Sequence, residues 1–220
     1  MTKEPNATLK TYGENVGLPK GQMGNSEVGH LNIGAGRIVY QDLARINLEV
    51  ENGSLADNSV LKNALDHAKR NGGRIHFMGL LSHGGVHSEQ SHLHALIDIV
   101  ENTGFSDVFI HAFTDGRDTN QSSAKSNILE LESHLMGKSA RLVSIIGRYF
   151  AMDRDKRWDR TKIAYDLLVN GIGNEVTSFL NACDLSYSQG ITDEFFESAI
   201  IAGKEGRIQP NDAVICYNFR

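Results

Sequence analysis

The spacing of apolar positions in the middle of the chain predicts three successive units, each made of a strand, a loop and a helix. Short apolar runs with the length of buried strands occupy residues 74–81, 107–113 and 140–146. Each run leads through a polar loop into a stretch with helical spacing, at about 89–102, 123–136 and 158–169. The strand ends recur every 32 or 33 residues, which is typical of βαβ units with parallel strands.

Four further segments complete the predicted fold. We expect a helix at 60–71, capped by Ser59, another at about 177–189, and a last strand at 214–218. Residues 38–50 combine helical and strand-like spacing, so their conformation stays open. The resulting fold class is α/β, with three layers in which helices cover both faces of a mostly parallel sheet.

Composition limits the functions that this fold can serve. The 220 residues are 40% hydrophobic, enough for a core of ordinary size, and carry a net charge of −5. Such an acidic balance argues against nucleic acid or a membrane surface as a partner. Cys183 and Cys216 lie far apart without a partner motif, which favours a reducing compartment. Since the chain lacks an apolar run of membrane-spanning length and a signal-peptide core, we expect a soluble, cytoplasmic protein. We also expect it to be a monomer.

Charged side chains follow the predicted parallel strands, whose carboxyl ends share one edge of the sheet. Ligands of open parallel sheets bind outside that edge. The residues that the sequence puts there are His83, His87, Asp115, Arg117, Asp118, Arg148, Arg154 and Arg220. Because a guanidinium holds a carboxylate or phosphate through two parallel hydrogen bonds, this set predicts a site for a small anion. The alternative is a solvated charged face, which we favour for Lys156, Arg157, Arg160 and Lys162.

A glycine-rich stretch precedes these units, and residues 21–37 read G-Q-M-G-N-S-E-V-G-H-L-N-I-G-A-G-R. Its serine, Ser26, stands where a short helix is expected to begin. A helix N-terminus attracts phosphate through its unpaired N–H groups and its dipole, so Ser26 is a candidate nucleophile that carries a phosphoryl group. The alternative is that Ser26 or Asn25 merely caps the helix. The stretch is neither a Walker loop nor a G-x-S-x-G elbow.

Several histidines lie close together in sequence or on neighbouring predicted strands. They are His83, His87, His92, His94 and His111, and some have the H-x-x-x-H and H-x-H spacings that can bind zinc. With no cysteine near them and no H-E-x-x-H motif, a zinc hydrolase is a minor alternative. A histidine at a loop tip, such as His87, more often binds an anion or transfers a proton.

Four motifs together closely resemble the cofactor-independent phosphoglycerate mutase family. Beside the stretch 21–37 they are S-H-G-G-V-H-S, H-A-F-T-D-G-R-D and G-R-Y-F-A-M-D-R-D-K-R-W-D-R. The match runs from about Leu9 to Arg220, in order and with matching gaps. The resemblance implies a two-domain enzyme of the alkaline phosphatase superfamily that interconverts 3-phosphoglycerate and 2-phosphoglycerate in glycolysis. Such an enzyme works through a phosphoserine intermediate, without 2,3-bisphosphoglycerate, and uses two manganese ions.

The same resemblance implies roles for individual residues. Ser26 would be the nucleophile and also a metal ligand. The substrate would be bound by His87, Arg117, Asp118, Arg148, Arg154 and Arg220. Glu89 departs from the family, which often has histidine at that position.

The family enzyme is more than twice as long as this chain, so the resemblance implies an internal fragment. Residues 1–40 would be the C-terminal part of the first phosphatase-domain segment, and residues 41–220 a phosphotransferase domain truncated at its C-terminal end. The other metal ligands and a catalytic lysine would lie outside the chain. We therefore expect the isolated chain to be inactive and to bind no manganese. The alternative from another class is a stand-alone module that binds a sugar phosphate or an organic anion.

Overall fold

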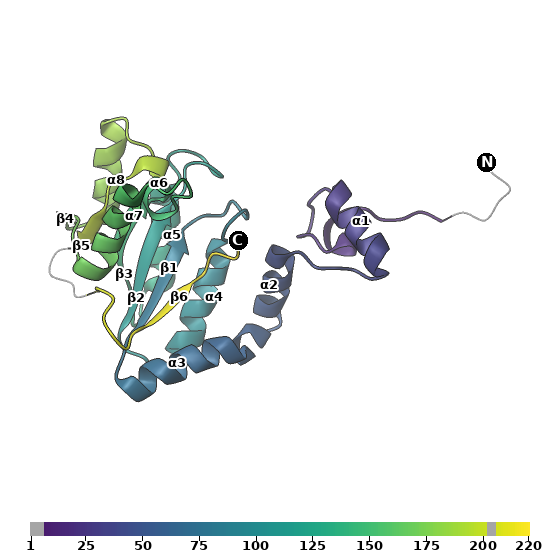
Figure 1. The fold of residues 1–220 in the computed structure, drawn as a ribbon, viewed down its shortest axis with the longest axis horizontal. Coiled ribbons are helices and arrows are strands. Elements are labelled where there is room, and N and C mark those ends of the chain that lie inside the picture. Colours follow the sequence, from purple (N-terminus) through teal and green to yellow (C-terminus); the bar gives the residue numbers. More distant parts are fainter. Residues whose placement is uncertain (1–6, 202–205) are drawn as a thin grey trace. The chain divides into compact units, whose positions relative to one another are not determined.

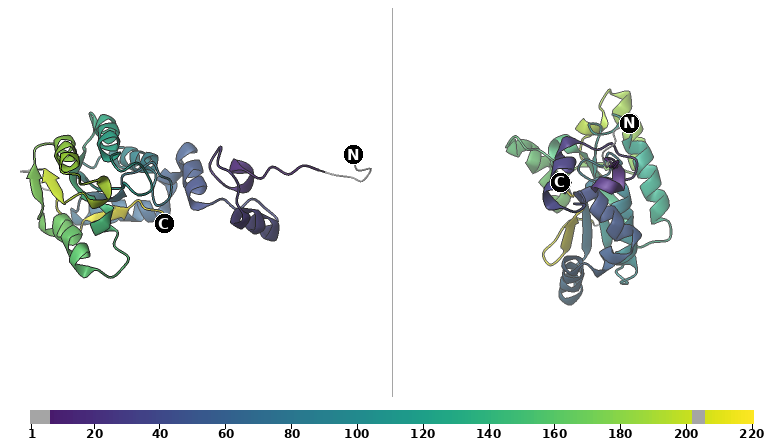
Figure 2. Two further views of the ribbon diagram at one scale, coloured as in Figure 1. Left: turned by 90° about the horizontal axis from the view of Figure 1, so that it is seen from above. Right: turned by 90° about the vertical axis from the view of Figure 1, so that its right-hand side faces the viewer.

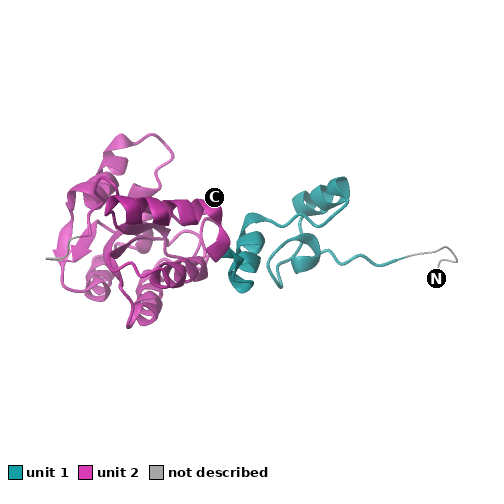
Figure 3. Cartoon of the chain, turned by 90° about the horizontal axis from the view of Figure 1, so that it is seen from below, with its two compact units in different colours: residues 1–55 teal, residues 56–220 magenta. Residues whose placement is uncertain are grey.

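The computed structural model describes residues 7–201 and 206–220, which belong to two compact units. Unit 1 comprises Met1–Leu55 and unit 2 comprises Ala56–Arg220, as coloured in Figure 3. The assignment of residues 1–40 and 41–220 to different domains of a parent enzyme stays a prediction.

Unit 2 is built on a six-stranded sheet with the strand order β4-β5-β3-β2-β1-β6 (Figure 1). Four strands run parallel, namely β1 (Ile75–Leu80), β2 (Val108–Thr114), β3 (Ala140–Gly147) and β6 (Ala213–Cys216). These are the four strands that the sequence predicts, with bounds that differ by two residues at most. The sequence analysis missed two short strands, β4 (Asn174–Val176) and β5 (Ala199–Ile201), of which β5 pairs with β3 in the antiparallel sense.

Helices lie on both sides of this sheet, which confirms the predicted fold class (Figures 1 and 2). Because crossovers between parallel strands are right-handed, α4 (Gln90–Glu101) and α5 (Ala124–Leu135) cover the same face. α7 (Trp158–Tyr165) continues into a π-helical turn, η3 (Asp166–Asn170), so the helix expected at 158–169 changes its winding near its end. Two more helices confirm the predicted pattern, α3 (Ser59–Asn71) before β1 and α8 (Phe179–Ser188) after β4.

Side-chain hydrogen bonds define where two of these helices, α3 and α8, begin. Asn58 caps α3, because its side-chain oxygen accepts hydrogen bonds from the N–H groups of Val60 and Leu61 at 2.9 and 3.2 Å. The predicted cap, Ser59, is instead the first residue of the helix. Ser178 caps α8 by accepting from the N–H of Asn181. None of the helices in the described part of the chain is both long enough and apolar enough to cross a membrane.

The core of unit 2 lies between the sheet and its helices. Leu80, Phe113 and Ile146, one from each of the three consecutive parallel strands, pack with Ala164 and Leu167. All five are at most 6% exposed. The ends of the three strands are therefore held together by apolar contacts, which gives the loops that follow them a rigid base.

A row of buried polar side chains crosses the same sheet. His76 lies between Asp212 and His111, with its Nε2 2.9 Å from Asp212 Oδ2 and its Nδ1 3.0 Å from His111 Nε2. His111 Nδ1 lies 2.7 Å from Ser144 Oγ. One N–H on each neutral imidazole satisfies the whole row, because Ser144 donates to His111, His111 to His76, and His76 to Asp212. Burial, with smaller contributions from His76 and Arg74, lowers the pKa of His111 to about 3.

Unit 1 is small and mostly helical. It contains a 3₁₀ turn, η1 (Gly13–Val16), and two helices, α1 (Ser26–Ala35) and α2 (Asp42–Glu51). Most of the segment left open by the sequence is therefore helix. A cluster of three buried side chains, Val16, Leu18 and Val28, forms the core of this unit. A further 3₁₀ turn, η2 (Ser54–Asp57), spans the boundary between the units.

Candidate anion-binding site

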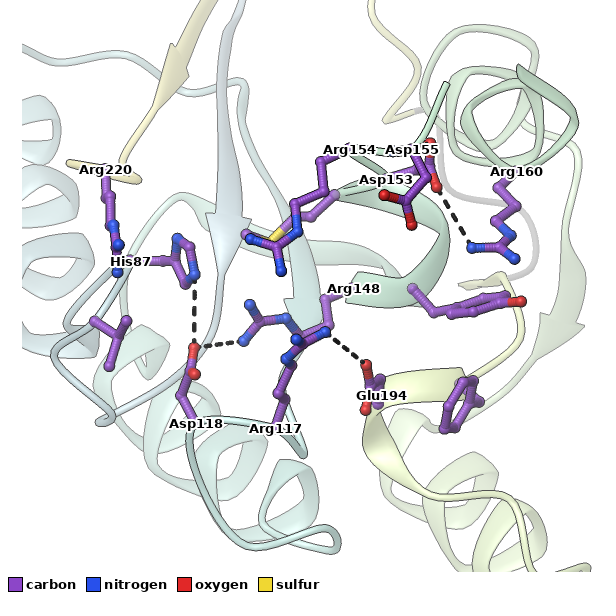
Figure 4. Close-up of a pocket in the computed structure, with 14 residues that line it drawn as sticks. His87, Arg117, Asp118, Arg148, Asp153, Arg154, Asp155, Arg160, Glu194 and Arg220 are labelled. Carbon is purple, nitrogen blue, oxygen red and sulfur yellow. Dashed lines mark hydrogen bonds and ion pairs between the residues drawn. The ribbon is translucent and has the colours of Figure 1, made fainter. Parts of the chain in front are cut away.

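A cavity of about 360 Å³ lies at the carboxyl ends of the parallel strands of unit 2 (Figure 4). It lies where ligands of such sheets bind, because β1 has β2 on one side and β6 on the other, so the strand order reverses at β1. The cavity is lined by all six residues of the substrate site that the resemblance implies, His87, Arg117, Asp118, Arg148, Arg154 and Arg220. The geometry thus brings together side chains that are up to 133 positions apart in the sequence. Their role as ligands of a substrate stays a proposal.

Arg148 is the most firmly held of these side chains. It is the first residue of α6 (Arg148–Ala151), directly after β3, and its side chain is 9% exposed. Its Nη1 donates to Asp115 Oδ1 at 2.7 Å and to Asp118 Oδ2 at 2.6 Å. Burial opposes the charge of Arg148, but the hydrogen bonds to Asp118 and Asp115 outweigh it and raise its pKa. The guanidinium is therefore charged and fixed before any ligand arrives.

Asp115 holds both Arg148 and the loop that carries Arg117 and Asp118. Its side chain is fully buried and accepts hydrogen bonds from the N–H groups of Arg117 and Asp118, at 3.1 and 2.9 Å. The hydroxyl of Ser82, in the loop after β1, donates to it at 2.5 Å. Burial opposes its ionisation, but the hydrogen bonds from Asp118 and Ser82, together with those of Arg148 and Arg117, lower its pKa. Asp115 therefore connects the loops after three strands.

The sequence analysis put Asp115 at the sheet edge but gave it no role. The available signal was an aspartate directly before Gly-Arg-Asp, at the end of a buried strand. In such a turn an aspartate side chain accepts hydrogen bonds from N–H groups two or three residues further on. The structural role could therefore have been predicted from the motif alone.

His87 lies in the loop after β1 and faces the cavity. Burial, followed by the nearby charge of Arg148, lowers the pKa of His87, so it is neutral at pH 7. Its Nε2 lies 3.8 Å from Asp118 Oδ2. Its backbone carbonyl accepts a hydrogen bond from the N–H of Phe219 at 2.9 Å, which attaches the segment after β6 to the loop after β1. This bond brings the neighbouring Arg220 to the rim of the cavity.

Three arginines at the rim are more loosely held than Arg148. The side chain of Arg117 is 55% exposed, and its Nη1 lies 3.6 Å from Glu194 Oε1. Arg154 and Arg220 are exposed, and no carboxylate in the described part of the chain lies within ion-pair distance of either. These three side chains can therefore turn toward an incoming anion at little cost.

The loop that carries Arg154 is itself firmly anchored. Asp153, whose side chain is 2% exposed, accepts hydrogen bonds from the N–H groups of Asp155 and Arg157 at 3.1 and 2.8 Å. It also pairs with Arg160, which lies over the ring of Tyr149 at 3.8 Å from its centroid. Arg160 was expected on a solvated face, and the structure corrects this, because stacking on Tyr149 draws its side chain to the cavity wall.

The charges of the cavity nearly cancel. Its lining includes five arginines, namely Arg117, Arg148, Arg154, Arg160 and Arg220. It also includes four carboxylates, Asp118, Asp153, Asp155 and Glu194. With His87 neutral, the lining has a net charge of +1, and the buried carboxylate of Asp115, which is bonded to Arg148, offsets it. A cavity of this size with several guanidinium groups suits a small organic anion.

Ser26 belongs to unit 1 and begins α1. The side-chain oxygen of Asn25 accepts from the N–H of Val28 at 3.0 Å, so Asn25 is the helix cap and the Ser26 hydroxyl is not used for capping. Ser26 is exposed, and its Oγ lies 3.2 Å from His30 Nδ1. The same ring nitrogen is 2.7 Å from the carbonyl oxygen of Ser26, which can only accept, so Nδ1 carries the proton. His30, one helical turn after the serine, had no role in the sequence analysis.

The histidines that suggested zinc do not form one ligand set. His83 bonds to Glu89 and Glu130, at 2.8 and 2.9 Å, and His94 Nδ1 lies 3.9 Å from the same Glu130, whereas His111 belongs to the buried polar row. Across residues 7–201 and 206–220, no three or more His, Cys, Asp or Glu side chains are grouped so that they could hold a metal ion. The zinc alternative therefore has no ligand set in the described part of the chain.

Comparison with known proteins agrees with this geometry. The fold and the cavity define unit 2 as an α/β domain with a candidate site for a small anion at the carboxyl edge of its sheet. Residues 46–220 match the family described as BPG-independent PGAM N-terminus, and the chain belongs to this family.

Proteins from several organisms resemble this chain in sequence or structure. The chain is 53% identical to the 2,3-bisphosphoglycerate-independent phosphoglycerate mutase of Bacteroides fragilis and 50% identical to 2,3-bisphosphoglycerate-independent phosphoglycerate mutase 2 of Methanosarcina acetivorans. All of the chain aligns with each, covering 44% and 43% of their lengths. A crystal structure of Leishmania mexicana phosphoglycerate mutase at low cobalt concentration matches 96% of this chain with a TM-score of 0.81 at 30% identity, over 41% of its own chain. The chain thus spans less than half the length of these relatives.

Proposed function

We propose that this chain is part of a 2,3-bisphosphoglycerate-independent phosphoglycerate mutase, which interconverts 3-phosphoglycerate and 2-phosphoglycerate. The relatives named above support the reaction class. The observation that carries the proposal is the cavity, because basic side chains from the ends of four parallel strands meet around a space sized for a small anion. In this proposal the cavity holds the glycerate part of the substrate, and Ser26 accepts its phosphoryl group.

The proposed reaction has two mirrored halves. In the first, the bond between phosphorus and the 3-oxygen of the substrate breaks, a bond between phosphorus and Ser26 Oγ forms, and the serine proton ends on the glycerate oxygen. In the second, the 2-oxygen of the same glycerate takes the phosphoryl group and its proton returns to the serine. The glycerate has to stay bound between the halves, which replaces a bimolecular encounter by a positioned one.

The residues that line the cavity can keep the glycerate bound between the two halves of the reaction. Arg154 can form paired hydrogen bonds with the glycerate carboxylate, and Arg117 can do so in place of its contact with Glu194. Arg148, fixed by Asp115, supplies a charge that does not have to be reorganised. The second oxygen of Asp118 can accept a hydrogen bond from a glycerate hydroxyl, and the neutral His87 next to it can donate a hydrogen bond to the same ligand.

The family resemblance implies two manganese ions for the complete enzyme, and the Leishmania mexicana structure was obtained at low cobalt concentration. A divalent ion would lower the pKa of a bound serine hydroxyl and stabilise charge on the transferred phosphoryl group. This chain offers one candidate donor, Ser26 Oγ, and its described residues do not form a group that could complete a site. The metal site therefore does not fit within this chain alone, and we assign no step to it.

The role of Ser26 can be tested in a full-length enzyme that contains this chain. After addition of 3-phosphoglycerate and rapid acid quenching, mass spectrometry should find a phosphorylated peptide that contains Ser26. Ser26→Ala should abolish both this peptide and turnover, whereas Ser133→Ala, an exposed serine on α5, should change neither. Normal activity in Ser26→Ala would exclude the proposed nucleophile.

The cavity can be tested in the 220-residue chain. Calorimetric titration with 3-phosphoglycerate should detect weak binding that Arg148→Ala combined with Arg154→Ala removes. Lys156→Ala combined with Arg157→Ala deletes the same charge from exposed positions beside the cavity and should leave binding intact. Equal binding by both double variants would locate the ligand elsewhere. Turnover by the 220-residue chain would contradict the expectation that it is inactive.

A further inference from the structure

Glu194 lies on a short 3₁₀ turn, η4 (Asp193–Phe195), which closes one side of the cavity. This turn is rigidly attached to the strands that carry the arginine loops. Thr114, the last residue of β2, donates its hydroxyl to the carbonyl of Asp193 at 2.7 Å, and the N–H of Gly147 at the end of β3 donates to the carbonyl of Phe196 at 2.8 Å. The buried carboxylate of Asp193 accepts from the N–H of Ala124 at 2.8 Å.

Two glycines allow the backbone of Glu194 to approach both arginine loops. A Cβ atom at Gly116 would lie 2.8 Å from the nitrogen of Glu194, and one at Gly147 would lie 2.4 Å from its carbonyl oxygen. These glycines directly precede Arg117 and Arg148. The contact needs residues without side chains at both positions, so the place of Glu194 between the loops is built into the fold.

The side chain of Glu194 points from this fixed backbone into the cavity, where Figure 4 draws its pair with Arg117. Its side chain is 23% exposed, and its Oε1 lies 3.6 Å from Arg117 Nη1, longer than a hydrogen bond. We propose that Glu194 is a specificity-determining residue, a built-in counter-anion that a ligand has to displace from Arg117. This inference rests on the proposed function, because it concerns how the same cavity distinguishes phosphoglycerate from glycerate.

The charge of the ligand determines how strongly Glu194 opposes binding. Glycerate carries one negative charge, and a phosphate ester adds about 1.5 to 2 more at pH 7. The repulsion from Glu194 grows with the total negative charge of the ligand, so it weakens binding of phosphoglycerate more than binding of glycerate. In the proposed reaction, Glu194 therefore favours release of phosphoglycerate over release of the glycerate that stays bound while the phosphoryl group is on Ser26.

The test uses Glu194→Gln, which keeps the shape of the side chain and removes its charge. Binding of D-glycerate and of 3-phosphoglycerate to the 220-residue chain is measured by calorimetry at low salt. We expect affinity to increase about threefold to tenfold for 3-phosphoglycerate, and less for D-glycerate. The increase should shrink at about 0.5 M salt. The control is Glu197→Gln, which removes the same charge from an exposed side chain bonded to Asn174 and should change nothing.

The outcomes separate this inference from the proposed function. If the wild-type chain binds both ligands and Glu194→Gln binds them equally well or more weakly, the inference is wrong and the proposed cavity stands. If neither protein binds either ligand, the proposed role of the cavity and the inference about Glu194 are both wrong. Glu194→Ala should likewise increase the affinity for 3-phosphoglycerate more than the affinity for D-glycerate. A circular dichroism spectrum like that of the wild type establishes that each variant is folded.

Discussion

Replacing Asp115, the buried carboxylate beneath the cavity, by alanine should destabilise unit 2 more than removal of any of the four carboxylates that line the cavity. The change removes the acceptor of two backbone N–H groups and of the Ser82 hydroxyl, and one of the two carboxylates that neutralise Arg148. Because the Arg148 side chain is only 9% exposed, water cannot fully replace the lost partner. Arg148 keeps its bond to Asp118, so its charge is not left entirely alone.

The size of the effect follows from these contacts. Removal of one member of a buried ion pair costs about 3–5 kcal/mol. The remaining bond to Asp118 puts the expected loss near the lower end, at about 3 kcal/mol of the free energy of unfolding. For a domain of this size that loss lowers the midpoint of thermal unfolding by roughly 6–12 °C.

Urea unfolding followed by circular dichroism at pH 7 measures this difference. Asp155→Ala is the matched control, because Asp155 lines the same cavity but is exposed, and we expect a change of at most about 0.5 kcal/mol. The fold lowers the pKa of Asp115 from its ordinary value of 3.8, so its contribution is present above that value and is lost as the pH falls through the folded-state pKa. The difference should therefore persist at pH 5. A loss below about 1 kcal/mol for Asp115→Ala would refute the argument that it anchors three loops.

Two further predictions concern groups that do not line the cavity. The pKa of His111 is lowered from 6.5 to about 3, so its neutral form contributes stability that is complete above pH 6.5 and declines as the pH falls toward 3. At pH 5 the lowered pKa of His111 should reduce the free energy of unfolding by about 2 kcal/mol relative to pH 7.5. Urea midpoints that do not change between pH 7.5 and 5 would contradict this. For the thiols, burial and then Asp193 raise the pKa of Cys183 to about 12, whereas Cys216 is exposed. An aromatic disulfide reagent should modify one thiol rapidly in the native chain, and Cys216→Ser should abolish that reaction.

The sequence was sufficient to predict the central sheet. The apolar runs at 74–81, 107–113 and 140–146 are buried on both sides, so they lack the alternation of an exposed strand and stand out against polar loops. By contrast, β4 and β5 have three residues each, too few for a recognisable period, and they exist because β3 offers them a free edge. Their formation depends on tertiary contacts that a local pattern does not contain.

The candidate site was predictable to a similar degree. Arg117, Arg148 and Arg220 could be assigned to one edge because each follows a predicted parallel strand. Glu194 could not, since it follows a helix and reaches the cavity only through η4 and its contacts with two glycines. Arg160 was assigned to solvent because helical spacing does not reveal a stacking partner such as Tyr149, which precedes it by eleven positions.

The pairing of β6 with β1 has a consequence for how the chain acquires its site. β6 is made 138 residues after the strand it pairs with, as the register between Ile75 and Ala213 records. During synthesis on a ribosome, one side of β1 therefore lacks its neighbour until residues 213–216 emerge, and an unpaired strand edge is prone to associate with other chains. Arg220 joins the other arginines only after that delay, so nascent chains that stop before β6 should be recognisable by chaperone capture and by the lack of a complete cavity.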